Sequence, residues 1–418
     1  MKRTFNGIMI FLVLVICISV YYIQNTPTFN VTGETDFIIL DSSQATQSSI
    51  EYAVDACNMY AFKQYQKYVE NEGENVFFSP FSISTCLSMI YEGAKGETAD
   101  EMQRVFEWSS IKNERIPSAA YIYNKINDPE NECEIHSANA VWAQEGYPFN
   151  EEYLEIIESG YGGKAESVDF GRSERTRKQI NDWVMYRTND KIQNLLEKGM
   201  IDSKTVMVLT NVVYFKGDWE NKFISGRTRE TVFNVSSDRQ VMVDMMFLRD
   251  KRFNYSETDM VQVLEMDYLG GDYSMIIVLP KETGLDMVEE SLDYKVFSRW
   301  VDDLEERDVI LSVPKFSLET KYVMNEDLSE LGMPLAFTPS ADFSGVSSRD
   351  GLWLGYIVHQ AYVNVTEKGT EAAAATGGSY VLSMPSGVVF RADHPFIFTI
   401  MEKETGLILF MGRVIDPS

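Results

Sequence analysis

The sequence predicts an α+β fold in a single large domain, with helices packed on large, mostly antiparallel β-sheets. Helical periodicity dominates the first 200 residues and strand-like runs dominate beyond Thr205, a segregation typical of α+β domains. No Pro-, Gly- or Ser-rich linker interrupts the middle of the 418-residue chain, which favours one domain over two. The 44% hydrophobic content supplies a large core and excludes a disordered or collagen-like chain.

The predicted helices have apolar residues at helical spacing and recognisable starts. Ser79 supplies an N-cap with Pro80 at the first helical position, and Thr98–Glu101 matches a capping box that opens another helix. The remaining predicted helices span Ile50–Val69, Asn150–Ser159 and Arg175–Glu197.

The predicted strands are short apolar runs rich in β-branched and aromatic residues. Two of them flank the turn at Lys403–Gly406, which predicts a hairpin. The runs are Val206–Phe215, Tyr273–Leu279, Val309–Val313, Gly355–Val365, Val388–Phe390, Phe396–Met401 and Leu407–Met411.

The charge balance narrows the classes of partner. With 37 Lys+Arg against 63 Asp+Glu, the formal net charge is −26. A surface this acidic repels phosphate backbones, so we expect no nucleic-acid partner. Acidic pairs such as Asp302–Asp303 and Glu305–Glu306 are interpreted as a solvated helix face.

The N-terminal sequence predicts an export signal, an uncleaved anchor, or both. Two basic residues precede an apolar run from Ile8 to Ile23, which we interpret as an uncleaved signal-anchor, with a cleaved signal peptide as the alternative. The positive end stays inside, so the remaining chain is expected outside the cytoplasm, secreted or membrane-anchored. The predicted organisation is a hydrophobic segment at 1–23, a polar tether at 24–49 and a folded domain at 50–418.

Export gives meaning to four glycosylation acceptor patterns. They begin at Asn30, Asn234, Asn254 and Asn364; Asn30 is the best candidate, and Asn364 lies in a strand-like run. Cys17 belongs to the apolar segment, which leaves an odd number of further cysteines and no CxxC pattern. Cys57 and Cys86 sit at helical spacing among apolar residues, which predicts buried thiols, with a single bridge as the alternative.

Enzyme signatures are missing from the sequence. It contains no HExxH, Walker A, CxxC or GxSxG pattern, and we expect neither a metal nor a cofactor. The glycine-rich Gly160–Ala165 follows a predicted helix rather than a strand, so it is interpreted as a loop and not as a dinucleotide site. The three histidines, His136, His359 and His394, adjoin no nucleophile motif and are interpreted as structural.

One segment has the wrong composition for a β-rich core. From Glu367 the chain reads EKGTEAAAATGGSYVLSMPSGVVF, with four consecutive alanines at Ala372–Ala375 and two glycines at Gly377–Gly378. Such residues have weak strand propensity, and the segment separates two strand-like runs. It therefore predicts a long exposed loop, and loops of this length inside a domain are usually functional.

Several long motifs in this chain resemble signatures of the serpins, the serine protease inhibitor family, in the family's order. They are NVFFSPFSISTCLSMIYEGAKGETADEM at Asn75–Met102, ANAVWAQ at Ala138–Gln144, TNVVYFKGDWENKF at Thr210–Phe223, HQAYVNVTEKGTEAAAAT at His359–Thr376, and ADHPFIFTI with FMGRV near the C-terminus. The resemblance covers residues 50–418 and implies a serpin domain whose long loop is the reactive-centre loop.

The resemblance implies a suicide-substrate inhibitor, not an enzyme. A target protease forms an acyl-enzyme ester with the loop, which then inserts as a new strand into the main sheet and distorts the protease. The implied hinge of the loop begins at Glu367 and Gly369. Alternate side chains of a strand share a face, so Thr370, Ala372, Ala374 and Thr376 would enter the core together. All four are small and uncharged, which favours inhibition; the alternative is a non-inhibitory serpin acting as a binding protein or chaperone.

Counting within the resemblance places the scissile bond. In inhibitory serpins it lies about seventeen residues from the start of the hinge, which implies Ser383–Met384, with Leu382–Ser383 as the neighbouring choice. The loop has no Arg or Lys between Glu371 and Phe390, so elastase-, chymotrypsin- or subtilisin-like targets are expected in a covalent complex with a monomeric inhibitor.

The resemblance also assigns residues that control sheet opening. Ser79, Ser82, Asn211 and His359 match the shutter, a buried polar cluster beneath the sheet, and Trp219 matches the aromatic residue at the breach, where the hinge enters. Some serpins carry a basic heparin-binding helix, but the corresponding region near Ser109–Pro117 offers only two cations. We therefore expect no glycosaminoglycan activation.

Overall fold

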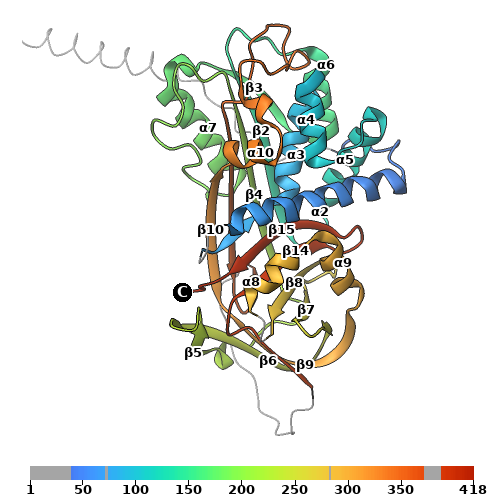
Figure 1. Cartoon of the computed structure of the whole chain (residues 1–418), viewed down its shortest axis with the longest axis vertical. Coiled ribbons are helices and arrows are strands. Elements are labelled where there is room, and N and C mark those ends of the chain that lie inside the picture. Colours follow the sequence, from blue (N-terminus) through green and yellow to red (C-terminus); the bar gives the residue numbers. More distant parts are fainter. Residues whose placement is uncertain (1–38, 71–73, 282–283, 371–386) are drawn as a thin grey trace, which may run out of the picture. The chain divides into compact units, whose positions relative to one another are not determined.

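The structure is a computed structural model that describes residues 39–70, 74–281, 284–370 and 387–418. The predicted signal-anchor at 1–23 and most of the predicted tether lie outside the described residues. Among the residues described, no helix combines the length and apolarity needed to cross a bilayer. Figure 1 shows that the helices from the first half of the chain gather around one end of the long strands.

The helices of the described chain lie mainly in its first half. They are α2 (Gln47–Val69), α3 (Pro80–Tyr91), α4 (Gly96–Phe106), α5 (Lys112–Ile126), α6 (Glu151–Tyr161), α7 (Ser173–Arg187), α8 (Leu285–Ser291), α9 (Tyr294–Asp302) and α10 (Asn325–Leu331).

The described strands form two sheets. The larger has the order β1 (Val76–Phe78), β15 (Leu407–Val414), β14 (Phe396–Glu402), β8 (Tyr273–Pro280), β7 (Val261–Asp267), β6 (Gln240–Glu257), β9 (Glu305–Pro314) and β13 (Val388–Arg391), and β5 (Arg229–Asn234) pairs with β6. The smaller has the order β10 (Phe316–Val323), β11 (Tyr356–Val365), β12 (Gly369–Thr370), β4 (Met207–Asp218), β2 (Glu134–Gln144) and β3 (Lys164–Val168). Most neighbours are antiparallel, as the sequence predicts; β11–β4, β2–β3 and β13–β9 are parallel.

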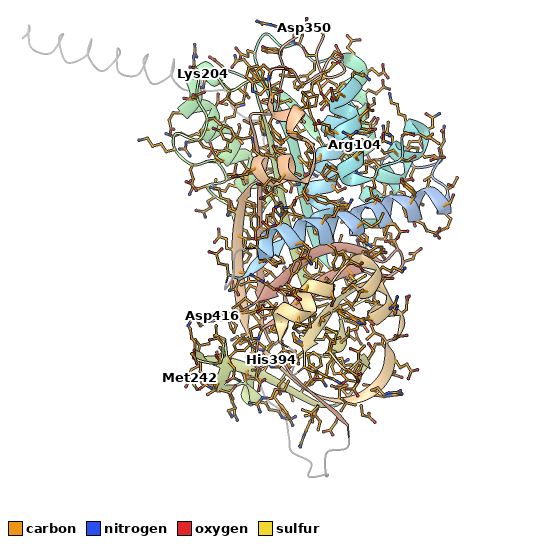
Figure 2. All side chains as sticks on the ribbon, in the orientation of Figure 1. Arg104, Lys204, Met242, Asp350, His394 and Asp416 are labelled. Atoms are coloured by element: carbon orange, nitrogen blue, oxygen red, sulfur yellow. The ribbon has the colours of Figure 1, made fainter. Side chains whose placement is uncertain are left out.

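Both faces of the smaller sheet are covered. Helix α3 packs on one face and is buried along ten of its twelve residues. On the other face, Ile180 and Val184 of α7 join a cluster with Trp142, Val208 and Val358 of the sheet. Side chains fill the space between ribbons (Figure 2). Any rearrangement of this sheet must therefore disturb packed layers on both of its faces.

The helix predictions are correct except in two places. The Ser79 hydroxyl caps α3 by accepting from the Ser82 amide, as predicted. The predicted capping box at Thr98 is wrong, because α4 already begins at Gly96 and the Thr98 hydroxyl instead accepts from the amide of Asp342. The predicted helix to Glu197 ends at Arg187, because Asn189 and Asp190 adopt left-handed backbone angles.

Two further differences concern polar segments. Asp302 ends α9, but Glu305 and Glu306 begin β9, so the interpretation of this acidic stretch as one helix face is wrong, although both glutamates are exposed. Leu40 is buried within the stretch predicted to be a tether. Its amide donates to the Asn124 side chain of α5, which donates back to the Leu40 carbonyl.

The described cysteines are free, buried thiols. Cys57 and Cys86 are buried as predicted, and Cys133 is buried too; none of the three forms a bridge. The glycine-rich stretch near Gly162 joins the end of α6 to β3, and Gly162 itself has a left-handed backbone, so it serves as a helix terminator.

A buried ion pair joins three distant parts of the chain. Arg413 of β15 donates to both carboxylate oxygens of Glu289 on α8, at 3.2 and 3.0 Å, and the Tyr65 hydroxyl of α2 donates to the same carboxylate at 2.6 Å. Both charged side chains are less than a tenth exposed. Burial raises the pKa of Glu289, and the bonds from Tyr65 and Arg413 counteract that rise.

We expect Arg413→Met to lower the free energy of unfolding at pH 7 by about 3–5 kcal/mol, because it leaves a buried carboxylate without a cation. Loss of the cation raises the pKa of Glu289 further above its unfolded value, so the loss shrinks as the pH falls and the carboxyl becomes neutral. Urea unfolding at pH 7 and pH 5 measures both effects. The double variant Arg413→Met/Glu289→Gln is the control and should lose less; an equal loss in the single and double variants contradicts the assignment.

Candidate functional site

The predicted hinge begins as a two-residue strand inserted into one end of the smaller sheet. Gly369 and Thr370 form β12, which pairs antiparallel with β4 at Asp218 and Gly217 and with β11 at Val365. A tight turn joins β11 to β12: the Thr366 amide donates to the Gly369 carbonyl at 2.9 Å. Thr370 is fully buried.

The residues around this turn hold the hinge through backbone contacts. The amide of Trp219 donates to the Lys368 carbonyl at 2.7 Å, and its indole NH donates to the Thr366 carbonyl at 2.9 Å. The amide of Phe223 donates to the Glu367 carbonyl. Trp219, predicted through the resemblance to mark the breach, thus contacts the turn at which the hinge begins, and three main-chain carbonyls of the hinge are bound irrespective of their side chains.

Both residues of β12 make its fit between the neighbouring strands specific. A Cβ at Gly369 would lie 2.0 Å from the Gly217 carbonyl oxygen, so only glycine fits between the strands. The Thr370 hydroxyl shares a 2.8 Å hydrogen bond with the buried hydroxyl of Tyr268, whose ring stacks on Trp219 with centroids 4.4 Å apart. Tyr268 was not predicted from the sequence.

The Glu367 carboxylate anchors the other side of the turn. It accepts from the Thr228 hydroxyl at 2.8 Å and lies 3.6 Å from the Lys315 ammonium group. Partial burial alone would raise the pKa of Glu367, but hydrogen bonds from its own backbone and from Thr228, together with the Lys315 charge, lower it below its usual value.

Beyond β12 the two flanking strands close on each other. Over Tyr356–Ala361 of β11 and Val208–Val213 of β4 they pair directly and in parallel, six residues to each side. The sheet is thus split at one end, where β12 lies between the strands, and joined at the other. An antiparallel strand that continued β12 would have to replace those six pairs.

The predicted shutter lies at the joined end. His359 and Asn211 are opposite each other in the β11–β4 register, and their side chains share a 2.5 Å hydrogen bond. The Asn211 amide group also donates to the Ser82 hydroxyl at 2.6 Å. The Ser79 amide donates to His359 Nε2 at 3.0 Å, and the Ser79 hydroxyl donates to the Leu409 carbonyl. All four predicted shutter residues therefore meet in one buried network that ties both strands to α3.

The network fixes the ionisation state of His359. Because Nε2 accepts from the Ser79 amide, the ring carries its proton on Nδ1, which donates to the Asn211 side-chain oxygen. Complete burial lowers the pKa of His359 to about 3, since a charged ring would lose its hydration. A neutral His359 therefore joins the strands across the physiological pH range.

Two members of the network were missed by sequence reasoning. Asn139 accepts from the Asn211 amide group, and Ser137 lies 3.4 Å from the Ser82 hydroxyl; both are on β2. Asn139 belongs to the ANAVWAQ motif and Ser137 precedes it, so two polar residues at alternate positions of a strand, which share one face, were the available signal. The predicted hinge residues Ala372, Ala374 and Thr376, and the predicted reactive bond at Leu382–Met384, lie outside the described residues.

The sequence also predicts that His394 is structural and that no metal is bound. His394, labelled in Figure 2, lies within 2.8 Å of the Pro280 carbonyl oxygen and 3.0 Å of the Asp393 carboxylate, so it joins two segments of the larger sheet. The hydrogen bond to Asp393 raises the pKa of His394. Within the described ranges, no group of three or more His, Cys, Asp or Glu residues is arranged to hold a metal ion.

We expect acid to destabilise the fold through His359. Its folded pKa of about 3 lies below the unfolded value of about 6.5, so the unfolded chain takes up the proton first and stability falls as the pH drops between these values. From pH 8 to pH 5 this contribution is about 2 kcal/mol. Urea unfolding of His359→Gln should show a decrease over this range that is smaller by that amount. The control His394→Gln removes a group of raised pKa and should steepen the decrease; an unchanged slope in His359→Gln contradicts the assignment.

Comparisons with known proteins agree with this geometry. The serpin family model, described as serine protease inhibitor, matches residues 55–417. An uncharacterized serpin-like protein of Thermococcus kodakarensis is 39% identical over 87% of this chain and 85% of its own length. Serpin B10 of Bos taurus is 36% identical over 88% of this chain and 100% of its own length.

A solved structure carries the same fold. Human thyroxine-binding globulin, crystallised in complex with its ligand, superposes with a TM-score of 0.82 at 28% identity and covers 88% of this chain and 100% of its own. A family model across most of the chain, relatives above 30% identity and a matching fold lead to one conclusion. The chain belongs to the serpin family of serine protease inhibitors.

Proposed function

We propose that the protein inhibits extracytoplasmic serine proteases by the suicide-substrate mechanism. The observation that carries the proposal is the hinge itself: β12 already occupies the split end of the smaller sheet, aligned with the strands that a longer insertion would separate. Strand insertion of this kind is a two-state transition that releases stored strain.

The register of β12 supports the proposal. Continuing its pairing with β4 and β11 one residue at a time brings every second hinge residue opposite a core-facing pair, and laterally paired residues of a sheet share a face. The predicted partners are Val363 and Phe215 for Ala372, Ala361 and Val213 for Ala374, and His359 and Asn211 for Thr376. These positions need small, uncharged side chains. The hydroxyl of Thr376 would also arrive where the His359–Asn211 hydrogen bond must open.

The proposed chemistry begins as ordinary proteolysis. The serine hydroxyl of the protease attacks the carbonyl of Ser383, the bond to Met384 breaks as its nitrogen takes up the hydroxyl proton, and the new amino terminus remains on the C-terminal segment. The ester joins protease to inhibitor until water hydrolyses it. Insertion of the hinge before that step carries the protease along the sheet and distorts its catalytic residues. The uncharged residues around Ser383 support elastase-, chymotrypsin- or subtilisin-like targets.

The proposed setting is outside the cytoplasm, secreted or anchored through residues 1–23, with a monomer forming a covalent complex with one protease. Polyanion activation is not part of the proposal, because both cations of the candidate region near Ser109–Pro117 already have acidic partners. Lys112 pairs with Glu152 at 2.8 Å, and Arg115 pairs with the buried Glu92 at 2.7 Å.

We expect a covalent complex with at least one of pancreatic elastase, chymotrypsin and subtilisin that survives boiling in SDS. N-terminal sequencing of the released fragment should begin at Met384, or at Ser383 if Leu382 is the residue attacked. Cleavage without any SDS-stable complex contradicts inhibition. In that case the melting temperature before and after cleavage identifies the alternative, because an unchanged value indicates a non-inhibitory serpin that acts as a binding protein. The relative thyroxine-binding globulin is described by its name as a protein of that kind.

We expect Ala372→Arg to convert the inhibitor into a substrate. A guanidinium facing Phe215 and Val363 would have to enter the core uncompensated, which slows insertion relative to hydrolysis of the ester. Ala373→Arg is the matched control, because the side chain at position 373 would lie on the opposite face of the inserted strand. Complex yield and loop cleavage are measured together on denaturing gels. Ala372→Arg should be cleaved at the normal rate with little complex, and equal loss of complex in both variants contradicts the predicted register.

A further inference from the structure

His394 lies at the corner that joins the edge of the larger sheet to its interior. Strand β13 ends at Arg391 and β14 begins at Phe396, so the corner is short. Nε2 of His394 lies 2.8 Å from the Pro280 carbonyl oxygen, and Nδ1 lies 3.0 Å from a carboxylate oxygen of Asp393. Pro280 is the last residue of β8. The ring therefore fastens the corner both to itself and to a strand inside the sheet.

Both partners of the ring can only accept a hydrogen bond. A carbonyl oxygen carries no hydrogen, and an ionised carboxylate carries none either. A neutral imidazole has a single N–H, which serves one of the two oxygens, whereas the positively charged ring has two and serves both. The geometry therefore fits a charged His394. It contrasts with the buried His359, whose Nε2 accepts from the Ser79 amide.

The charged groups around the ring favour its proton. The hydrogen bond from His394, together with the charge of Arg391 at 2.9 Å from the other carboxylate oxygen, lowers the pKa of Asp393, so that this partner stays ionised. The hydrogen bond to Asp393 outweighs partial burial and raises the pKa of His394. On the side of β8, the next charge is Lys281, whose ammonium group is already paired with Glu257 of β6 at 2.8 Å.

Strand β13 has few attachments besides this corner. Among the described strands it pairs with β9 alone, over four residues, and Phe390 anchors it in the core. The neighbouring strands add neutral backbone bonds: the Ala392 amide donates to the Ser312 carbonyl at 2.9 Å, and the Asn234 amide of β5 donates to the Asp393 carbonyl at 2.8 Å. A short strand with one neighbour opens at a lower free energy than the core. Loss of a corner bond should therefore show first in β13.

Deprotonation removes one of the two ring bonds. The nitrogen that loses its hydrogen then turns a lone pair toward an oxygen that also carries lone pairs, and the remaining bond is no longer charge-assisted. The folded pKa of His394 lies above the unfolded value of about 6.5. The contribution of the charged ring is therefore complete below the unfolded value and is lost as the pH rises through the folded one.

We propose that His394 is a protonation switch that clamps β13: the charged ring fixes the corner to β8, and the neutral ring lets β13 open more often. Because β13 begins just after residues 371–386, the switch sets how firmly the chain is held on the C-terminal side of the predicted reactive bond. The clamp does not depend on the proposed function, since β13 has the same place in the sheet whether or not the protein inhibits a protease.

The charge on the ring is measured by nuclear magnetic resonance of the full-length protein with isotope-labelled histidine. The His394 signal is identified by its loss in His394→Gln. We expect a titration midpoint above about 6.5 in the native protein. Asp393→Asn keeps an accepting oxygen but removes the negative charge, so its midpoint should be lower. A native midpoint at or below the ordinary value overturns the switch, and so does an equal midpoint in Asp393→Asn.

The opening of β13 is measured by hydrogen–deuterium exchange of residues 388–393 at pH 6 and pH 8.5, corrected for the intrinsic exchange rate. We expect protection in the native protein to fall at least about threefold at the higher pH. His394→Arg is the matched control: its guanidinium stays charged and can donate to both oxygens, so its protection should not change. His394→Gln should show low protection at both pH values, and it serves if His394→Arg fails to fold. A pH response in either variant that equals the native one overturns the switch.

A second measurement of opening uses Arg391, the one arginine of β13. Trypsin can cut after Arg391 only when β13 opens, and the cut produces a fragment of residues 392–418 that mass spectrometry identifies. Dividing the rate by that of a synthetic peptide with the sequence of residues 386–396 removes the pH dependence of trypsin itself.

We expect this ratio to rise at least about threefold from pH 6 to pH 8.5 in the native protein. It should stay constant in His394→Arg, whose new arginine precedes Pro395 and is not cut. A constant native ratio overturns the switch. Cuts elsewhere in the chain are the internal control, and an equal rise at those sites also overturns it, because the whole domain rather than β13 would then be opening.

Discussion

The structure depends on the contact between β4 and β11. These strands pair directly at one end of the smaller sheet and are held apart at the other by the two residues of β12. They are joined as a parallel pair over six positions, a pairing slightly less stable per residue than an antiparallel one. The predicted shutter, breach and hinge residues all contact this pair. His359 and Asn211 connect the strands where they meet, and Trp219 holds the turn where they separate.

The hydrogen-bond network between β4 and β11 is held together by uncharged groups rather than by ion pairs. The ring of His359 stays uncharged because it is buried and because its Nε2 accepts from a main-chain amide. A charged ring would bind Asn211 more strongly but could not be buried beneath a sheet without a large loss of hydration. The chain's large acidic excess lies elsewhere, where most ion pairs are solvent-exposed and contribute little to stability. The buried pair of Glu289 and Arg413 is the contrasting case, because its loss leaves a charge without solvent.

The fold class, most strand positions and the four shutter residues could be predicted from the sequence, the last through the family resemblance. Local signals sufficed where a residue acts on its neighbours, as with the Ser79 cap of α3. A residue such as Tyr268 could not be found, because its role arises from strands that are distant in sequence and meet only in the fold. The overlong helix prediction after Arg187 has a similar cause: Ile192, Leu195 and Leu196 are buried against the sheet by an irregular segment, which imitates helical periodicity.

The position of the two C-terminal strands matters for a cut chain. Strand β14 lies between β8 and β15, and β15 in turn pairs with β1 near the start of the domain. Arg413 is bound to Glu289, and the Asn75 side chain bonds the backbone of Ile415 and Asp416. Every residue of both strands is buried. A protein severed at the predicted reactive bond would therefore be two polypeptides in one folded body, and the short C-terminal piece would separate only when the core unfolds.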